Sequence, residues 1–335
     1  MGCNYSTGSD VIIGIGVQPN NCVVAPEIFY FSVSDLDKGE EITREIKKGI
    51  TNNNIKGVDL KETDRFSAPS FTLPVGPILS GLMLQAGLPT YSVSGAGPYT
   101  HIFTPANNAC PTFFTIVVKD NVQTYIIYNA VLDSASLALA ADGDLTWDMT
   151  FAGDFPIIDN AFILGAPVVD TEFKNTCVCA FMAVDTATID ADILAHAGTI
   201  ADPYETSVCI NNFNLDIEPD LGEINCFACT EGCGGNKKRY NKDLVVSGNF
   251  EVIFVNQALY NMWLNNLQGA IKIRIKCPGS TDELVIDIPT YKINDFSVPY
   301  NTDDIIVATI GFNALNISNS GGLTGTVINT IPTYV

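Results

Sequence analysis

Cysteine is the residue in this sequence best suited to bind a metal. Cys226, Cys229 and Cys233 are separated by two and three residues and are followed by two glycines, as in one half of a zinc site. The chain has 10 cysteines, and folding would have to bring in a fourth ligand. The candidates for that ligand are Cys177, Cys179 and Cys209. Since a second such pair and a nearby histidine are missing, free thiols or disulfides formed after release from the cell are favoured over zinc, and no cofactor is expected.

Histidine and the acidic residues give little support for catalysis. His101 and His196 are far apart in the sequence, and His101 stands at the start of a predicted strand, where a structural or exposed role is expected. Asp142 and Asp144 lie in a predicted hairpin turn, where aspartate bonds to the backbone. The chain has no nucleophile motif, phosphate-binding loop or metalloprotease motif. We therefore expect no catalytic residue and no enzymatic activity.

The composition excludes several classes of protein. The 335 residues include 17 Lys+Arg and 37 Asp+Glu, for a formal charge of -20, yet 47% are hydrophobic and only 16% are charged. A disordered acidic chain would lack these apolar residues, and a nucleic-acid binder needs an excess of basic residues. No apolar run reaches the roughly 18 residues of a membrane helix. The length predicts about two domains, and the absence of a visible secretory signal predicts synthesis in a cytoplasm.

Short strands dominate the local pattern. Runs of β-branched and aromatic residues bounded by turn residues predict strands near 11–17, 27–33, 113–118, 124–128, 137–140, 145–151, 244–254, 271–275, 284–288 and 305–312. Hairpin turns are expected at 120–121 and 142–143. Helical spacing is confined to 77–88 and 257–267, with a short turn near 192–197. These elements predict a mainly β protein and not a doubly wound α/β chain.

The same order of elements occurs twice along the chain. Each predicted helix follows an aromatic strand, and Leu79 and Leu259 lie at matching places. Upstream of the helices, residues 31–40 match residues 213–223, with Asp37 at the place of Asp220, Gly39 at that of Gly222 and Glu40 at that of Glu223. This duplication predicts two similar β domains. Their expected bounds are 1–155 and 206–335, with 156–205 as a connecting segment that also holds the first strands of the second domain.

Basic residues are concentrated in two equivalent segments. The segments 38–65 and 237–242 hold most of the 17 basic residues, so the rest of the chain is strongly acidic. Asparagine and glycine runs at 52–54 and 234–236 predict that both segments are loop-like arms. A single basic arm would be interpreted as a solvated loop. Two basic arms at equivalent places favour the interpretation that they dock onto acidic faces of neighbouring copies. The residues predicted to dock are Arg44, Lys47, Lys48, Lys56, Lys237, Lys238, Arg239 and Lys242.

Several segments resemble one known family. Tyr99–Pro105 followed by Pro111–Ile116 resembles the HxFTP…PSFTI segment of the major tail tube proteins of long-tailed bacteriophages. Residues 76–87 resemble the helix that precedes this segment, and 246–254 resembles part of the C-terminal half of the family. The resemblance covers roughly residues 60–315, whereas the ten cysteines and 155–205 depart from the usual pattern.

The resemblance implies a structural protein of the virion tail, assembled in the host bacterial cytoplasm. It implies two β-sandwich or barrel domains of tail-tube type, each with one flanking helix. Family subunits pair strands side by side into rings of six domains, so three such chains would form a pseudo-hexameric ring. Stacked rings would form a conduit through which double-stranded DNA passes without specific binding. The implied partners are other copies of the chain and the tail-tip or distal-tail, terminator and tape-measure proteins. No association with a membrane is implied.

Elementary physics agrees with this expectation. Ring closure removes exposed strand edges, and an acidic wall repels a DNA duplex and so keeps it moving. Along strands that line the channel, acidic residues and threonine would face DNA and apolar residues would face the core. Three alternatives remain: the inner tube of a contractile injection device, a secreted two-domain β-sandwich that binds ligands, and a hydrolase with an unrecognised site.

Overall fold

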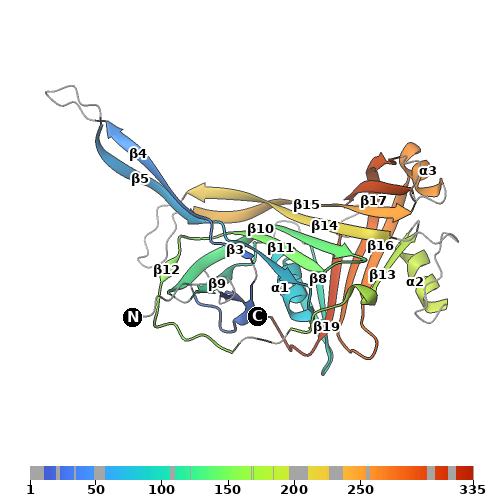
Figure 1. The fold of residues 1–335 in the computed structure, drawn as a ribbon, viewed down its shortest axis with the longest axis horizontal. Helices are drawn as coiled ribbons and strands as arrows, with labels where there is room; N and C mark the ends of the chain where they lie inside the picture. Colours follow the sequence, from blue (N-terminus) through green and yellow to red (C-terminus); the bar gives the residue numbers. More distant parts are fainter. Residues whose placement is uncertain are drawn as a thin grey trace.

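The computed structural model describes residues 11–19, 23–33, 35–48, 57–105, 110–120, 122–166, 168, 170–183, 185–195, 210–225, 237–253, 257–299, 306–315 and 322–334. Of residues 35, 41–48, 57–65, 191–195, 223–225 and 237–242, only the backbone is described. The structure is mainly β, as the sequence predicts, and it contains large antiparallel sheets and few helices (Figure 1).

The elements of the first half are β1 (Ile12–Val17), β2 (Phe29–Ser32), β3 (Asp35–Asp37), β4 (Glu40–Lys48), β5 (Gly57–Ser67), β6 (Ser70–Pro74), α1 (Pro77–Gly87), β7 (Thr90–Ser94), β8 (Tyr99–Thr104), β9 (Phe114–Lys119), β10 (Thr124–Ala140), β11 (Thr146–Ala152) and β12 (Ile157–Ile158). Those of the second half are β13 (Val178–Ala183), α2 (Thr186–Ala195), β14 (Ile210–Asn225), β15 (Lys237–Ile253), α3 (Ala258–Leu264), β16 (Gln268–Ile275), β17 (Glu283–Ser297), β18 (Val307–Ala314) and β19 (Thr324–Asn329).

One antiparallel sheet runs through both halves of the chain, and we call it the long sheet. Its strand order is β3-β6-β11-β10-β14-β15-β18-β17. The two halves meet where Ala135–Ala140 of β10 pair with Asn212–Ile217 of β14. The halves are therefore joined by backbone hydrogen bonds between strands and not by side-chain contacts alone.

Two further sheets lie against the long sheet, because β10 and β17 are long enough to serve in two sheets each. The first part of β10 pairs with β9 and β12, and β9 continues to β1 and β2. The first part of β17 pairs with β16 and β19, which lead to β13 and to β8 and β7. The last strand of the chain, β19, thus connects the β7–β8 hairpin of the first half to the second half.

The order of strand pairing occurs twice. It runs β1-β9-β10-β11-β6-β3 in the first half and β13-β16-β17-β18-β15-β14 in the second. Both long strands shift register at one corresponding place, skipping Asp133 in β10 and Asn294 in β17. A bulge at the same place in both halves bends the two strands alike.

The register gives the residues that correspond between the halves. The residue directly after the skipped one begins a row of residues that lie opposite one another on successive strands, and one such row crosses each half of the long sheet. In the first half, this row is Ser134, Thr150, Ser70 and Asp37. In the second half, it is Asp295, Gly311, Asn249 and Asn214. The counterpart of Asp37 is therefore Asn214, and the sequence-based match of Asp37 with Asp220 is wrong by six residues.

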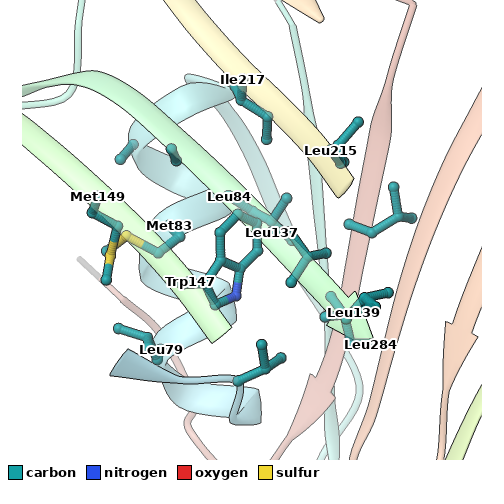
Figure 2. Close-up of a cluster of buried hydrophobic side chains, with 14 of the residues drawn as sticks. Leu79, Met83, Leu84, Leu137, Leu139, Trp147, Met149, Leu215, Ile217 and Leu284 are labelled. Carbon is teal, nitrogen blue, oxygen red and sulfur yellow. The ribbon is translucent and has the colours of Figure 1, made fainter. Parts of the chain in front are cut away.

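Helix α1 is buried under the junction between the halves. All eleven of its residues are buried, and Pro77 occupies its first turn, where a missing N–H costs nothing. Figure 2 shows Leu79, Met83 and Leu84 of this helix around Trp147, with Leu215 and Ile217 of β14 on the other side. Gly87 touches β14, since a Cβ there would lie 2.8 Å from Cγ2 of Ile217. The hydrophobic core is therefore continuous across the two halves.

The basic arms are strands and not loops, which corrects the sequence-based prediction. Glu40–Lys48 pair with Gly57–Ser67 in a two-stranded hairpin, and the ends of β14 and β15 pair as far as Asn225 and Lys237. The asparagine and glycine runs that suggested loops, at 52–54 and 234–236, belong to the segments 49–56 and 226–236, which lie outside the described residues. In Figure 1, both hairpins run toward the left end of the view, and α2 and α3 lie at the right end.

The predicted helices are largely confirmed. The first two lie at Pro77–Gly87 and Ala258–Leu264, whereas the short turn predicted near 192–197 belongs to a longer helix, Thr186–Ala195. The hairpin turn predicted at 142–143 connects β10 to β11. None of the helices in the described part of the chain has the length and apolar character needed to cross a membrane.

Asp170 binds the N-terminus of α1 from a distant segment. Its two carboxylate oxygens accept hydrogen bonds from the backbone N–H groups of Ile78 and Leu79, at 3.1 and 2.9 Å. Burial raises the pKa of Asp170 to about 6, although the two N–H groups oppose this shift. Gly76 leaves room for the carboxylate, because a Cβ there would lie 2.3 Å from Oδ2. This contact ties Asp170 to the start of α1, which lies about 90 residues earlier in the chain.

The stability of the chain should depend on pH through Asp170. Because its native pKa lies above the value of 3.8 for an ordinary aspartate, the native state holds the proton more tightly, and this contribution to stability is lost as pH rises through about 6. Between pH 5 and 7.5, the free energy of unfolding of the wild type should fall by roughly 1–1.5 kcal/mol relative to Asp170→Asn. Urea unfolding of both proteins measures this difference. The contribution of His101 to the pH dependence is the same in both proteins and therefore cancels. A difference that does not change with pH would contradict the prediction.

Candidate functional site

The long sheet has one apolar face and one polar face. In β11, Trp147, Met149 and Phe151 are buried against the core, whereas Thr146, Asp148 and Thr150 point the other way. Successive side chains of a strand point to opposite faces, so residues paired with Asp148 share its face. The polar face runs across all eight strands, and α1 lies on the opposite, apolar face.

Carboxylates predominate on this polar face. By strand alternation and register, the acidic residues placed there are Asp37, Asp148, Asp216, Glu218, Asp220, Asp243, Glu251 and Asp295. Among the side chains that the structure describes, Lys292 is the one cation assigned to the same face. The face is therefore a candidate surface for repelling a polyanion.

Hydrogen bonds between neighbouring strands hold these polar side chains in place. Ser136 donates to Asp216 at 2.6 Å across the junction between the halves, and Asn212 donates to Glu251 at 2.6 Å. The Thr72 hydroxyl donates to Asp148 in the first half. Cross-strand pairs of this kind fix side-chain positions on a sheet. The carboxylates are thus arranged in fixed rows.

Acidic residues along channel-lining strands were expected from the sequence, but which residues they are was not predicted. Apolar residues fall on every second position of 146–151, and this alternation could have placed Asp148 on the polar face. Asp216 is harder to find, because its place depends on the pairing of β14 with β10, two strands far apart in the sequence.

The predicted docking residues lie on the two hairpins. Arg44, Lys47 and Lys48 fall on β4, and Lys237, Lys238, Arg239 and Lys242 fall on β15, where only the backbone is described. Lys56 lies outside the described residues. At the base of the first hairpin, the Lys38 ammonium lies 3.7 Å from the ring centroid of Tyr125 and 3.5 Å from Glu40. The structure thus places the basic segments on two-stranded ribbons.

The cysteines in the described residues do not assemble a metal site. Cys226, Cys229, Cys233 and Cys209 lie outside the described residues. Cys177 forms a disulfide with Cys277 and is therefore not available as a fourth zinc ligand. Cys179 is a free thiol whose pKa is raised by burial, which disfavours the thiolate that a metal needs. No cluster of three or more potential ligand side chains occurs in the part of the chain that the structure describes.

His101 is a structural residue. It is fully buried, its Nδ1 lies 3.0 Å from the Tyr91 hydroxyl, and its Nε2 lies 3.1 Å from Oδ1 of Asn329. Burial lowers its pKa, so the neutral ring is favoured. The contact with Asn329 links β8 to the last strand, while His196 lies outside the described residues. His101 thus helps to attach the end of the chain.

Comparison with protein families gives a match. A family model described as phage tail tube protein matches residues 63–314, which is most of the chain. Among curated proteins, no relative of this sequence was found. The matched region begins in β5 and ends with β18, so it contains most of the long sheet.

Proposed function

The chain belongs to the phage tail tube protein family and is a structural component of the virion tail, and on this basis we propose how it builds the tube. Three copies form a ring, each supplying two tube-type domains, and rings stack into a conduit for DNA. The proposed domains are 1–155 and 206–335, with 156–205 as the connecting segment. The repeated pairing order of strands supports this division.

The polar face of the long sheet is the observation on which the proposal rests. Eight strands in each chain already form one continuous sheet, and three copies would give about 24 strands. At a spacing of ~4.8 Å, such a wall has a circumference of roughly 115 Å and a backbone diameter of about 37 Å. Side chains on both walls reduce that width but leave room for a duplex.

The charge of the polar face suits passage of DNA without binding. Among the described side chains of this face, eight carboxylates stand against one ammonium, so the face would repel phosphates. The apolar face with α1 would point outward from the channel. Other tail proteins would meet the tube at its ends and inside it, namely the distal-tail, terminator and tape-measure proteins. Assembly would occur in the host cytoplasm.

Electron microscopy of the purified protein tests the proposal. Stacked rings with a central channel and threefold symmetry are expected. Rings with strict sixfold symmetry, in which each chain contributes one domain, would contradict the duplication. A monomer that persists at high concentration and low salt would contradict the proposed function as a whole.

The basic hairpins are expected to join successive rings. Replacing Lys47 and Lys48 by Glu, or Lys237 and Lys238 by Glu, should leave the rings intact but stop their stacking, because the hairpins would then repel the acidic bodies of the next ring. Negative-stain microscopy and sedimentation measure tube length. Lys119→Glu with Lys174→Glu is the matched control, since both lysines are exposed and lie outside the hairpins. Tubes of unchanged length in the hairpin variants would exclude the docking role.

A further inference from the structure

The junction inside the chain shows how one tube-type half can join another. Residues Ala135–Ala140 of β10 pair with Asn212–Ile217 of β14, and the helix beneath them, α1, is wholly buried. The backbone N–H of Ala141 donates to the carbonyl of Asn211 at 2.8 Å. Because hydrogen-bonded and non-hydrogen-bonded pairs alternate, Ala138 and Asn214 form a non-hydrogen-bonded pair.

The chain carries the counterparts of both sides of this junction at its two ends. The correspondence between the halves makes Asp295 the counterpart of Ser134, so Pro299 corresponds to Ala138. Asp37 corresponds to Asn214, as the row of opposed residues shows. Of the described strands, only β6 pairs with β3, and only β18 pairs with Asp295 and Ser297. Each end of the long sheet therefore presents one edge.

Helix α3 is the counterpart of α1, but it is not covered. Leu264 and Leu267 are 61% and 52% exposed, and Trp263 is 36% exposed. Tyr260 and Trp263 lie against Phe296 of β17, with ring centroids 5.5 and 6.0 Å apart. An apolar surface thus stands beside the edge of β17, at the place where the inner junction covers α1.

We infer, on the basis of the ring proposed above, that ring closure repeats the inner junction between two copies of the chain. The end of β17 in one copy pairs with β3 of the next copy, antiparallel, with Pro299 opposite Asp37 and Ser297 opposite Gly39. The neighbouring copy then covers Trp263 and Leu264 of α3. The partner is a second copy of this chain, because the two edge strands, β17 and β3, are the counterparts of β10 and β14, which already pair inside the chain.

Pro299 is compatible with this register. Proline has no backbone N–H, so it disrupts pairing only at positions where that N–H would donate a hydrogen bond to the partner strand. At the position of Ala138, the N–H points away from the partner strand, so proline there loses no hydrogen bond across the junction. The same proline explains why pairing of β17 with β18 ends at Ser297. Pro299 thus ends the pairing within the chain and leaves the outer edge usable.

Two cysteines test the register directly. In the full chain, Asp37→Cys and Pro299→Cys in different copies should form a disulfide on mild oxidation, because opposed residues of a non-hydrogen-bonded pair have Cα atoms only ~4.5 Å apart. Peptide mass spectrometry identifies this link among those of the native cysteines. Asp37→Cys with Ser297→Cys is the control, since a shift of two residues moves the atoms beyond disulfide reach. Rings without a 37–299 link, or with an equal 37–297 link, would overturn the inference.

A second measurement uses the native tryptophans, of which the chain has two. Trp147 is already buried, so assembly should shift the emission of the wild type to shorter wavelength through Trp263 and leave Trp263→Phe unshifted. Leu264→Lys should reduce the ring fraction by about tenfold or more, since a lysine would be buried at the contact. Val122→Lys, at a side chain exposed to a similar degree, should assemble normally.

The outcomes separate the two proposals. If the wild type forms no rings under any condition, the proposed function fails. If the wild type forms rings but Trp263 stays exposed and Leu264→Lys assembles as well as Val122→Lys, the position of the contact is wrong while the ring stands. A blue shift in the wild type together with loss of rings in Leu264→Lys supports the inference, provided that circular dichroism shows the variant chain to be folded.

Discussion

Replacing Asp148, Asp216 and Glu251 by lysine is expected to lower the yield of infectious particles by orders of magnitude while tails still assemble. The three carboxylates lie on the polar face, where lysine would attract the phosphates that the wild type repels. DNA should then bind isolated tubes, with an affinity that falls steeply as salt is raised. Plaque counts, triggered DNA ejection in vitro and DNA binding by purified tubes measure the effect.

Two controls make this test specific. Asp148→Asn, Asp216→Asn and Glu251→Gln keep hydrogen-bonding oxygens, so their effect isolates the loss of charge from the loss of cross-strand contacts. Lysine at Glu27, Asp142 and Glu172 makes the same change in net charge at exposed sites outside the polar face. If the polar-face variant ejects DNA at the wild-type rate and its tubes bind no DNA, this face does not line the channel.

Trp147→Ala is expected to destabilise the isolated chain by about 3–5 kcal/mol, because a large buried side chain is replaced by a cavity. Trp147 is fully buried between α1 and the long sheet (Figure 2), and its Nε1 donates to the hydroxyl of Ser80 at 3.1 Å. Urea unfolding followed by circular dichroism measures the change. Since α1 packs on both halves, the whole transition should move and not one part of it.

The other tryptophan supplies the matched control. Trp263→Ala should change the stability of the isolated chain by less than about 1 kcal/mol, because its side chain is partly exposed on α3. Its effect should be seen in assembly instead. Equal losses of stability from the two substitutions would mean that α3 is as well packed in the isolated chain as α1.

Much of the fold could be predicted from local pattern. Residues 145–151 alternate apolar and polar side chains, which indicates a strand with one buried face, and residues 77–88 have the spacing and the early proline of a helix. The hairpins were missed as strands because the sequences of 40–48 and 57–65 are rich in polar and charged residues and show no sustained alternation with apolar ones, and pairing of two strands by backbone hydrogen bonds does not require such alternation. The bias toward basic residues in these segments was nevertheless visible.

The candidate site was less accessible to sequence reasoning. Asp148 belongs to an alternating run, but its neighbours on the polar face come from β6, β10 and β14, and β10 pairs with β14 through residues up to 82 positions apart, Ala135 with Ile217. The match of Asp37 with Asp220 was offset by six residues from the register, because similar turn residues recur near, but not at, corresponding places. Only hydrogen-bond register resolves such an offset.

The amino-acid sequence by itself determined that this is a mainly β chain with two helices at matching places, a strongly acidic body and two basic segments. These properties follow from residue type and spacing along the chain, which act locally. The long-range pairing of β10 with β14 decided which halves touch, and therefore that α1 is buried whereas α3 presents Trp263 and Leu264 to solvent. Two helices with similar local patterns differ in burial because burial depends on what the rest of the chain places above them.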